Sequence, residues 1–292
     1  MIAAIEYNFT MIIFDFNQVA ISNLMEQIGS SKVPVDESLV RHMILNTIRT
    51  YVKKFKDSHG PEIVIACDNK NYWRREIFPF YKAGRKKARD SSGHDWNTIF
   101  ECLNKIRQEL KDFSPYKVVE VETCEADDII ATLVQKYSST QKIMILSSDK
   151  DFAQLQKFPN VDQYSPILKK YIKEPFPAVQ LKQLIIRGDK GDGIPNILSS
   201  DDVFVTGSRQ KPITENKILK WMNEDPNLFC EGEMKRNYSR NESLIDFTKI
   251  PEYLKLNILA KYDESEAHTK QVFMNYMIQN RLKNLLEVID EF

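Results

Sequence analysis

The chain has 292 residues, of which 42% are apolar and 28% are charged, and its formal net charge at pH 7 is zero. This length and composition predict a soluble globular protein of one large or two smaller domains, and the charge balance excludes a global field that would attract polyanions. No apolar run approaches the roughly 20 residues of a bilayer span, and the N-terminus lacks the basic region of a secretory signal, so neither a membrane protein nor a secreted protein is expected.

The four cysteines, Cys67, Cys102, Cys124 and Cys230, form no C-x-x-C pair and have no histidines nearby in the sequence. This spacing argues against a zinc site and against a disulfide framework. It is typical of a protein in the reducing cytoplasm.

The first half of the chain alternates between short apolar runs and helical patterns. Continuous apolar runs are typical of buried parallel strands, and an apolar stripe at helical spacing predicts an amphipathic helix. In chain order these patterns predict a strand at 11–14, a helix at about 37–56, a strand at 63–67, a helix at 96–113, a strand at 117–121, a helix capped by Thr123 and a strand at 143–148. Such alternation implies a parallel sheet with right-handed crossovers.

Past about residue 175 the pattern is mostly helical. We therefore expect an α/β fold, with a parallel-rich central sheet flanked by helices and a mostly helical C-terminal region. Residues 1–175 form the predicted α/β core, which includes a basic segment at 69–95, and residues 176–292 form the predicted helical region.

Three of the predicted strands run into an aspartate: Asp15, Asp68 and Asp149. Because ligands bind outside the carboxyl ends of the strands in open α/β sheets, these three aspartates predict a single acidic pocket. A pocket of bare carboxylates repels itself unless hard cations neutralise it. The chain is therefore expected to be a divalent-metal enzyme.

Further carboxylates stand in three short motifs. E-A-D-D starts a predicted helix, S-S-D-K-D-F follows a predicted strand, and R-G-D-K-G-D-G-I-P-N is rich in glycine. Each motif alone has an ordinary explanation, because acids stabilise the first turn of a helix and Asp and Gly are common in turns. Together with the strand ends they give nine candidate metal ligands: Asp15, Asp68, Glu125, Asp127, Asp128, Asp149, Asp151, Asp189 and Asp192.

These carboxylates, without clustered His or Cys, match Mg²⁺, or Mn²⁺ in its place, better than zinc. Two such ions about 3.5–4 Å apart hold a phosphodiester and activate a water for in-line attack. The acidic residues, two metal ions and a phosphate substrate therefore form one consistent prediction.

Residues 70–89 combine eight basic side chains with interleaved aromatic ones. Basic groups follow phosphates, and aromatic faces stack on bases without regard to sequence. The alternative is a solvated helix whose aromatic residues belong to the core. The position of this segment directly after Asp68 favours nucleic-acid binding.

The motifs F-D-F, C-D-N, Y-K-x-x-R, E-A-D-D, S-S-D-K-D-F and G-D-x-x-D-x-x-P occur here in the order of the structure-specific 5′-nuclease (flap endonuclease) superfamily, which the chain resembles over nearly its whole length. S-S-D-x-D-F-x-Q-L and the C-terminal L-I-D-F-x-x-I-P most resemble the ribonuclease H branch of T-even-type bacteriophages. The resemblance implies a PIN/5′-nuclease-like fold. It also implies a 5′→3′ exonuclease and flap endonuclease that acts on RNA–DNA and DNA–DNA duplexes and removes lagging-strand RNA primers in phage DNA replication.

Roles for single residues follow from the matching motif positions. The first metal ion would lie among Asp15, Asp68, Glu125, Asp127 and Asp149, and the second among Asp128, Asp151, Asp189 and Asp192. The implied catalytic residues are Lys82 and Arg85, at the scissile phosphate, and Asp149. Tyr81 would orient the unpaired end, and the other implied nucleic-acid contacts are Arg74, Arg75, Lys86, Lys87, Arg89 and Lys190. Residues 184–205 would form a helix-turn-helix element that grips duplex DNA.

The resemblance implies duplexes with a 5′ end or flap as substrates, and a phage single-stranded DNA-binding protein and sliding clamp as partners. It also implies a monomer in the host cytoplasm, away from membranes. Three other functions fit parts of the sequence: a PIN-type ribonuclease, a nucleic-acid-binding relative that has lost catalysis, and a small-molecule phosphatase. PIN domains are usually shorter, lost catalysis would show as missing ligands, and a phosphatase has no use for the basic segment. Cleavage of a 5′-flap duplex with and without Mg²⁺ separates these functions.

Overall fold

The computed structural model describes residues 9–29 and 35–292, and a six-stranded sheet is the main feature of its α/β part. Residues 1–8, on which the expectation about a secretory signal rests, lie outside the described residues. The strands are β1 (Phe9–Asp15), β2 (Glu62–Cys67), β3 (Lys117–Glu120), β4 (Gln141–Leu146), β5 (Val161–Ser165) and β6 (Lys170–Ile172). They lie in the order β3-β2-β1-β4-β5-β6, and every pair is parallel except β5–β6. The predicted parallel-rich α/β fold is confirmed.

The chain divides into two compact units that do not follow chain order. The first unit comprises residues 1–70, 95–173 and 253–292, and the second comprises residues 71–94 and 174–252. The first unit therefore contains the sheet. Its helices are α1 (Phe16–Ile28), α2 (Glu37–His59), α5 (Trp96–Phe113), α6 (Ala126–Tyr137), η1 (Lys150–Lys157), α11 (Glu252–Glu264, all but its first residue), α12 (Lys270–Gln279), α13 (Lys283–Leu286) and η3 (Ile289–Glu291).

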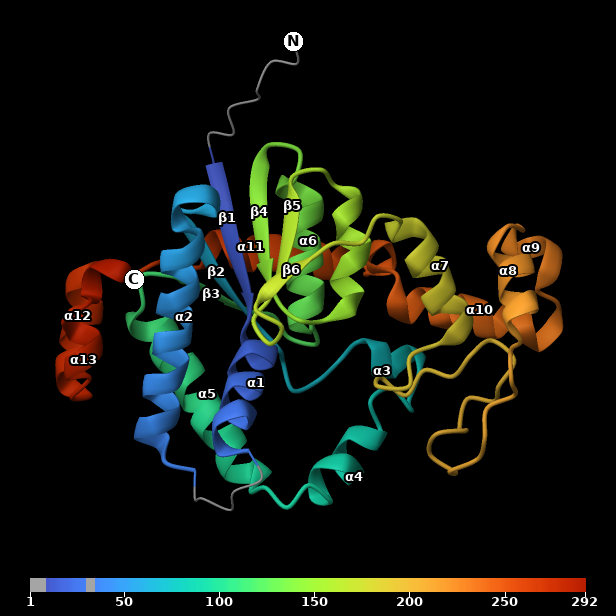
Figure 1. The fold of residues 1–292 in the computed structure, drawn as a ribbon, viewed down its shortest axis with the longest axis horizontal. Helices are drawn as coiled ribbons and strands as arrows, with labels where there is room; N and C mark the ends of the chain where they lie inside the picture. Colours follow the sequence, from blue (N-terminus) through green and yellow to red (C-terminus); the bar gives the residue numbers. More distant parts are fainter. Residues whose placement is uncertain (1–8, 30–34) are drawn as a thin grey trace, which may run out of the picture. The chain divides into compact units, whose positions relative to one another are not determined.

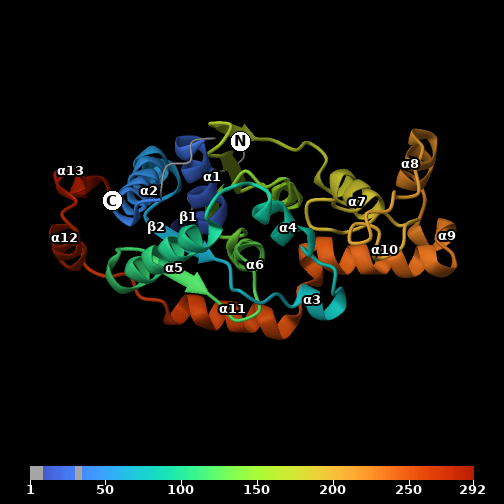
Figure 2. The same cartoon turned by 90° about the horizontal axis from the view of Figure 1, so that it is seen from below.

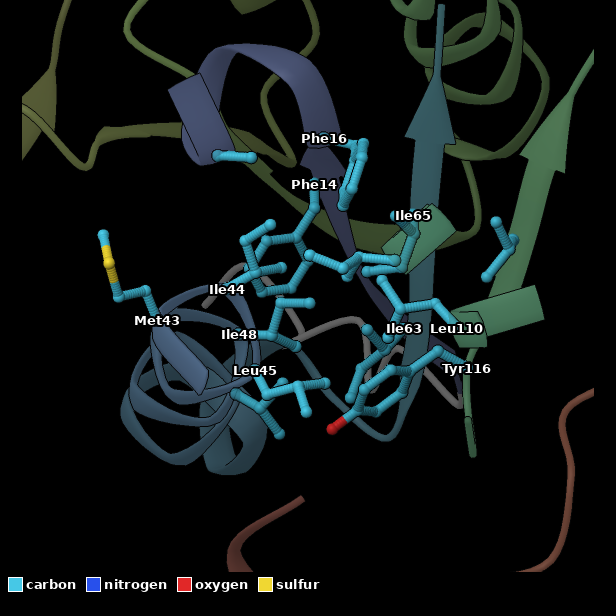
Figure 3. Packing of buried hydrophobic residues seen from close by; sticks show 14 of the residues in the cluster. Phe14, Phe16, Met43, Ile44, Leu45, Ile48, Ile63, Ile65, Leu110 and Tyr116 are labelled. Atoms are coloured by element: carbon cyan, nitrogen blue, oxygen red, sulfur yellow. The ribbon is translucent and has the colours of Figure 1, made fainter. Parts of the chain in front are cut away.

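Helices cover both faces of this sheet (Figure 1). α1, α2 and α5 contribute to the core on one face, while α6 contacts β1 to β4 on the other. The side chains of each buried strand alternate between the two faces, so Phe14 and Ile65 meet Ile44 and Ile48 of α2 (Figure 3). Beyond α6 runs α11, seen from below in Figure 2, with the rings of Tyr137 and Tyr262 5.6 Å apart.

Most predicted helix and strand positions are confirmed, including the helix at 96–113. The N-cap prediction for Thr123 is wrong. Thr123 lies in a turn with φ +63°, and Glu125 caps α6 two residues later. A polar residue shortly before an apolar stripe identifies a helix start, but it does not separate a capping residue from a turn residue.

The second unit is helical around its own apolar core, which includes Phe78, Ile186, Trp221 and Ile245. Its helices are α3 (Arg74–Ile77), α4 (Gly84–Asp90), α7 (Pro177–Arg187), α8 (Glu215–Met222), α9 (Pro226–Phe229), α10 (Gly232–Ile245) and η2 (Phe247–Lys249). The predominantly helical pattern predicted past residue 175 is confirmed.

The second helix of the helix-turn-helix predicted at 184–205 is not present. α7 ends at Arg187, and residues 188–214 form turns, irregular backbone and one isolated bridge between Asp189 and Ile194 before α8 begins. Gly188, Gly191 and Gly193 favour turns over a helix here. Within 9–29 and 35–292, no helix has the length and apolar composition needed to cross a membrane.

Candidate active site

The three strand-end aspartates lie at one edge of the sheet, because β2, β1 and β4 are adjacent and parallel. Asp15 is the last residue of β1 and lies beside Ala66 of β2, while Phe14 lies beside Leu146 of β4. Asp68 and Asp149 follow their strands at the same edge. The fold therefore brings these three predicted ligands to one place in the first unit.

Asp15 is buried and holds two hydrogen bonds. Its Oδ2 accepts from the Ser147 hydroxyl at 2.8 Å, and its Oδ1 accepts from the Gln18 backbone N–H at 3.2 Å. Burial, followed by the charges of Asp68 and Asp149, raises the pKa of Asp15 to about 7, although its two hydrogen bonds act in the opposite direction. This crowding of like charges is what a bound cation would relieve.

Two donors hold the Asp68 carboxylate, one at each oxygen. The Asn17 side-chain amide donates to Oδ2 at 2.7 Å, and the backbone N–H of Ala126, the first residue of α6, donates to Oδ1 at 2.8 Å. The N-terminus of α6 therefore stabilises Asp68 as an anion. The sequence reasoning did not identify Asn17, although an amide two residues after the strand-end Asp15 was visible in it.

The E-A-D-D motif forms a capping box at the start of α6. The Asp128 Oδ2 accepts from the Glu125 backbone N–H at 2.9 Å, and the Glu125 side chain accepts from the backbone N–H of Asp128. Both side chains are buried, whereas Asp127 between them is only half-buried. The ordinary explanation therefore accounts for two of the three acids, and their metal roles stay a prediction.

Asp149 and Asp151 form the start of η1. The Asp149 Oδ1 accepts from the backbone N–H of Asp151 at 2.9 Å, and the Asp149 N–H donates to Ser147 Oγ at 3.1 Å. The buried Gln163 donates to the backbone carbonyl of Asp149 at 2.7 Å. Ser147 stands inside a predicted motif without an assigned role, and no sequence signal pointed to Gln163.

No three His, Cys, Asp or Glu side chains within residues 9–29 and 35–292 lie close enough together to form a ready-made metal site. Adjacent strands are about 4.8 Å apart, so carboxylates at their ends suit a cation that keeps part of its water shell. Mg²⁺ behaves in this way, and all the donors here are oxygens. The donor set therefore fits a hydrated hard cation rather than a fully dehydrated one.

Asp189 and Asp192 belong to the second unit and are engaged there. The Asp189 Oδ1 accepts from the Gly191 backbone N–H at 2.7 Å. Asp192 accepts from the Tyr81 hydroxyl at 3.0 Å and from Arg85 at 2.7 Å, with the Lys82 ammonium at 3.6 Å. Burial opposes ionisation of Asp192, but Lys82 and Arg85 outweigh it and lower its pKa.

The turn at Asp192 fits closely against the basic segment. The Lys82 N–H donates to the Asp192 carbonyl at 2.8 Å, and Lys82 itself has φ +56°. Gly193 has φ +72°, and a Cβ there would lie 3.1 Å from the Phe80 carbonyl oxygen, so glycine suits this close approach. Lys82, Arg85 and Asp192 therefore form one cluster within the second unit.

The basic segment divides into a buried and an exposed part. Arg74 is buried and donates to the Leu244 carbonyl at 2.9 Å, and Trp73, Phe78 and Tyr81 are buried too. For these residues the alternative of a structural core explains the positions, and the nucleic-acid roles of Arg74 and Tyr81 stay predictions. The exposed basic residues are Lys70, Arg75, Arg85, Lys86 and Lys87 in this segment and Lys190 in the turn, whereas Arg89 is half-buried and Lys82 is buried. α4 has no buried residue, and its Lys86 and Lys87 are exposed.

Two family models together cover most of the chain. The model of the 5′-3′ exonuclease N-terminal resolvase-like domain matches residues 30–181, and that of the T4 RNase H C-terminal domain matches residues 176–292. The chain belongs to the 5′-3′ exonuclease family. Membership of this family confirms the predicted class of enzyme, a nuclease.

Several members of the family are similar in sequence. Ribonuclease H of Enterobacteria phage T4 is 36% identical, with 98% of this chain and 97% of that protein covered. Flap endonuclease Xni of Vibrio vulnificus strain YJ016 is 29% identical, with 74% of this chain and 80% of that protein covered. The predicted resemblance to phage ribonuclease H and flap endonucleases is confirmed.

Solved structures of the bacteriophage T5 enzyme share the exonuclease fold. A structure described as T5 5′-exonuclease with bound zinc ions has a TM-score of 0.61 at 15% identity, over 87% of this chain and 98% of that one. A T5 flap endonuclease complex with DNA and metal ions also has a TM-score of 0.61 at 15% identity, over 87% and 99% of the two chains. At this identity the likeness concerns the fold alone.

Proposed function

We propose that the chain is a Mg²⁺-dependent 5′→3′ exonuclease and flap endonuclease. Its substrates are RNA–DNA and DNA–DNA duplexes with a 5′ end or flap, and its role is removal of lagging-strand RNA primers in phage DNA replication. The observation that carries this proposal is the convergence of Asp15, Asp68 and Asp149 at the carboxyl ends of β1, β2 and β4. The T4 relative, covered almost completely, supports the substrate class.

The strand-end carboxylates would hold the first divalent ion together with Glu125 and Asp127. Asp128 and Asp151 are the proposed residues around the second ion, partly through water, and Asp189 and Asp192 of the second unit stay proposed metal ligands. A pair of such ions polarises the phosphodiester and lowers the pKa of the attacking water. The residues of this chain fix the carboxylates that would hold those ions: Asn17 and Ala126 fix the Asp68 carboxylate, and Ser147 fixes that of Asp15.

The exposed bases of α4 would follow the phosphates of the substrate strand. Lys82 and Arg85 are the proposed contacts of the scissile phosphate, where they would stabilise its developing charge. Both now pair with Asp192, so a phosphate bound to them competes with that carboxylate. Tyr81, which also donates to Asp192, lies in the same cluster.

Partner proteins and assembly state rest on the family resemblance. We propose that the chain works as a monomer in the host cytoplasm, with a phage single-stranded DNA-binding protein and a sliding clamp. Pull-down of each purified partner checks this part, and a failure there leaves the nuclease proposal intact.

Cleavage of a labelled 5′-flap duplex tests the proposed function. We expect cleavage near the junction in Mg²⁺ or Mn²⁺ and none in EDTA. Asp149→Asn should lower turnover by at least 100-fold while duplex affinity is kept, because it removes one metal-facing charge at the strand end. Asp57→Asn, at an exposed position near the end of α2, is the matched control and should cleave normally.

Two outcomes would contradict the proposal in different ways. Duplex binding by the unmodified chain without cleavage in any divalent metal would identify a relative that has lost catalysis. Near-normal turnover of Asp149→Asn would remove Asp149 from the mechanism.

A further inference from the structure

A buried side chain of the neighbouring strand β5 forms hydrogen bonds with the loop that carries Asp149. Gln163 lies in the middle of β5 and is fully buried. Its Nε2 donates to the Ser147 carbonyl at 3.1 Å and to the Asp149 carbonyl at 2.7 Å. One amide group therefore fixes the backbone on both sides of residue 148.

A glutamine is an unfavourable residue to bury in a sheet unless all its polar atoms are used. Here they are used: both N–H groups of the Gln163 amide meet carbonyls, and its Oε1 accepts from the Gln156 Nε2 at 3.1 Å. The neighbouring Cα positions belong to Ile145 of β4 and Ile172 of β6, so an apolar residue would suit packing alone. The hydrogen bonds to the Ser147 and Asp149 carbonyls therefore explain why a glutamine is buried at this position.

The loop residues that Gln163 contacts are also linked by a hydrogen bond to Asp15. The Ser147 hydroxyl, also fully buried, donates to Asp15 Oδ2 at 2.8 Å and accepts from the Asp149 N–H at 3.1 Å. Gln163 fixes the carbonyls of the same two residues. The positions of the Asp15 and Asp149 carboxylates therefore depend on one hydrogen-bonded frame made by Ser147 and Gln163.

We propose that Gln163 is a positioning residue for the divalent-cation site. Its hydrogen bonds fix the loop after β4. Together with Ser147, they keep the Asp149 carboxylate near that of Asp15, so that both carboxylates can bind the same cation. This inference rests on the proposed function, because it assigns Gln163 to the same metal centre. Partners of metal ligands commonly affect metal affinity or activity by about 10- to 100-fold.

The test measures Mn²⁺ binding to the full chain by calorimetry, without nucleic acid and well below the unfolding temperature. Gln163→Met keeps length and volume but removes both donors, and we expect its Mn²⁺ affinity to fall about 10- to 100-fold. Gln163→Glu places a carboxylate oxygen against the two carbonyl oxygens, so we expect its Mn²⁺ affinity to be lower than that of Gln163→Met. In cleavage assays, high Mn²⁺ should restore the turnover of Gln163→Met, and KM for the duplex should stay unchanged.

Gln141→Met is the matched control. Gln141 is also a buried glutamine in the sheet, at the start of β4, and its Oε1 has no hydrogen-bond partner. A lost buried amide costs packing at either position, but only Gln163 contacts the frame. Equal Mn²⁺ affinity of the two variants, with any loss confined to thermal stability, would overturn the positioning role.

A second pair keeps the proposal testable if Gln163→Met does not fold. Ser147→Ala removes the hydroxyl of the frame, and Ser114→Ala removes a fully buried hydroxyl without a hydrogen-bond partner. We expect weakened Mn²⁺ binding, by about 10-fold or more, only in Ser147→Ala; unchanged binding there overturns the proposal. Absence of Mn²⁺ binding by the unmodified chain would instead contradict the proposed function itself.

Discussion

Tyr116 carries a hydroxyl that the core does not satisfy. The residue is 2% exposed, and its Oη has no hydrogen-bond partner (Figure 3). A buried polar group without a partner costs its full desolvation free energy. We therefore predict that Tyr116→Phe raises the free energy of unfolding by about 1 kcal/mol, measured by urea denaturation.

Tyr276 provides the matched control for this substitution. It is equally buried and belongs to the same core cluster, but its hydroxyl donates to Glu109 at 2.7 Å. Tyr276→Phe should therefore lower the free energy of unfolding, by about 1 kcal/mol. If both variants shift in the same direction, the missing hydrogen bond is not the cause at Tyr116.

At the scale of residues, the sequence predicted the strand-end aspartates but not the side chains that hold them. Apolar runs are local patterns, so Asp15, Asp68 and Asp149 could be read from them directly. The contact between Ser147 and Asp15 spans 132 positions of the chain. Such a partner is chosen by the fold, and a single sequence carries no local signal for it.

Among the elements, α6 allows the capping and metal roles of its acids to be separated. Asp128 is fully buried and accepts from the Glu125 N–H. In EDTA, Asp128→Ala should lower the free energy of unfolding by about 1–2 kcal/mol because the cap is lost. Asp128→Asn keeps an acceptor oxygen and should cost less, as urea denaturation of both variants will show.

The exposed Glu122, in the turn before α6, serves as the control, and Glu122→Ala should leave stability unchanged. Calorimetry with Mn²⁺ then addresses the metal role. If Asp128→Asn binds Mn²⁺ as tightly as the unmodified chain, Asp128 acts only as a cap. If its Mn²⁺ affinity falls although the helix stays folded, Asp128 remains a predicted metal ligand. Equal stability of Asp128→Ala and the unmodified chain would refute the capping assignment.

Element positions were predicted best where a pattern is long. The stripe of Ile99, Leu103, Ile106 and Leu110 predicted α5 well, because apolar spacing kept over about three turns leaves little choice. Single-residue signals did worse: Thr123 is a turn residue, and the segment after Arg187 forms turns. Turns and caps use the same small polar residues, so only the backbone distinguishes them.

On the scale of the whole molecule, chain order was a poor guide to the compact units. Residues 71–94 of the basic segment cluster with 174–252, and the C-terminal residues 253–292 cluster with the sheet. Arg74 shows why: its partner, the Leu244 carbonyl, is 170 positions away. The predicted division into domains at 1–175 and 176–292 stays a prediction about function. Residues that pack together in one compact unit need not share one functional role.

The distribution of charge over the whole molecule determines how a chain without net charge can bind a polyanion. Its formal net charge is zero, so phosphate contacts must come from local groups such as the exposed Lys86 and Lys87 of α4. Each phosphate contact contributes about 0.9 to the slope of log affinity against log salt. We predict that Lys86→Ala with Lys87→Ala makes this slope shallower by about 2, measured by fluorescence anisotropy with a flap duplex in EDTA.

Lys111 and Lys136 give the matched control pair. Both are exposed, but they stand in the last turns of α5 and α6, which lead into β3 and β4 at the edge of the sheet opposite the aspartates. Replacing both by alanine makes the same change in net charge and should leave the slope as it was. An equal change in both pairs would mean that net charge alone governs binding, and an unchanged slope in the Lys86 and Lys87 pair would remove α4 from the interface.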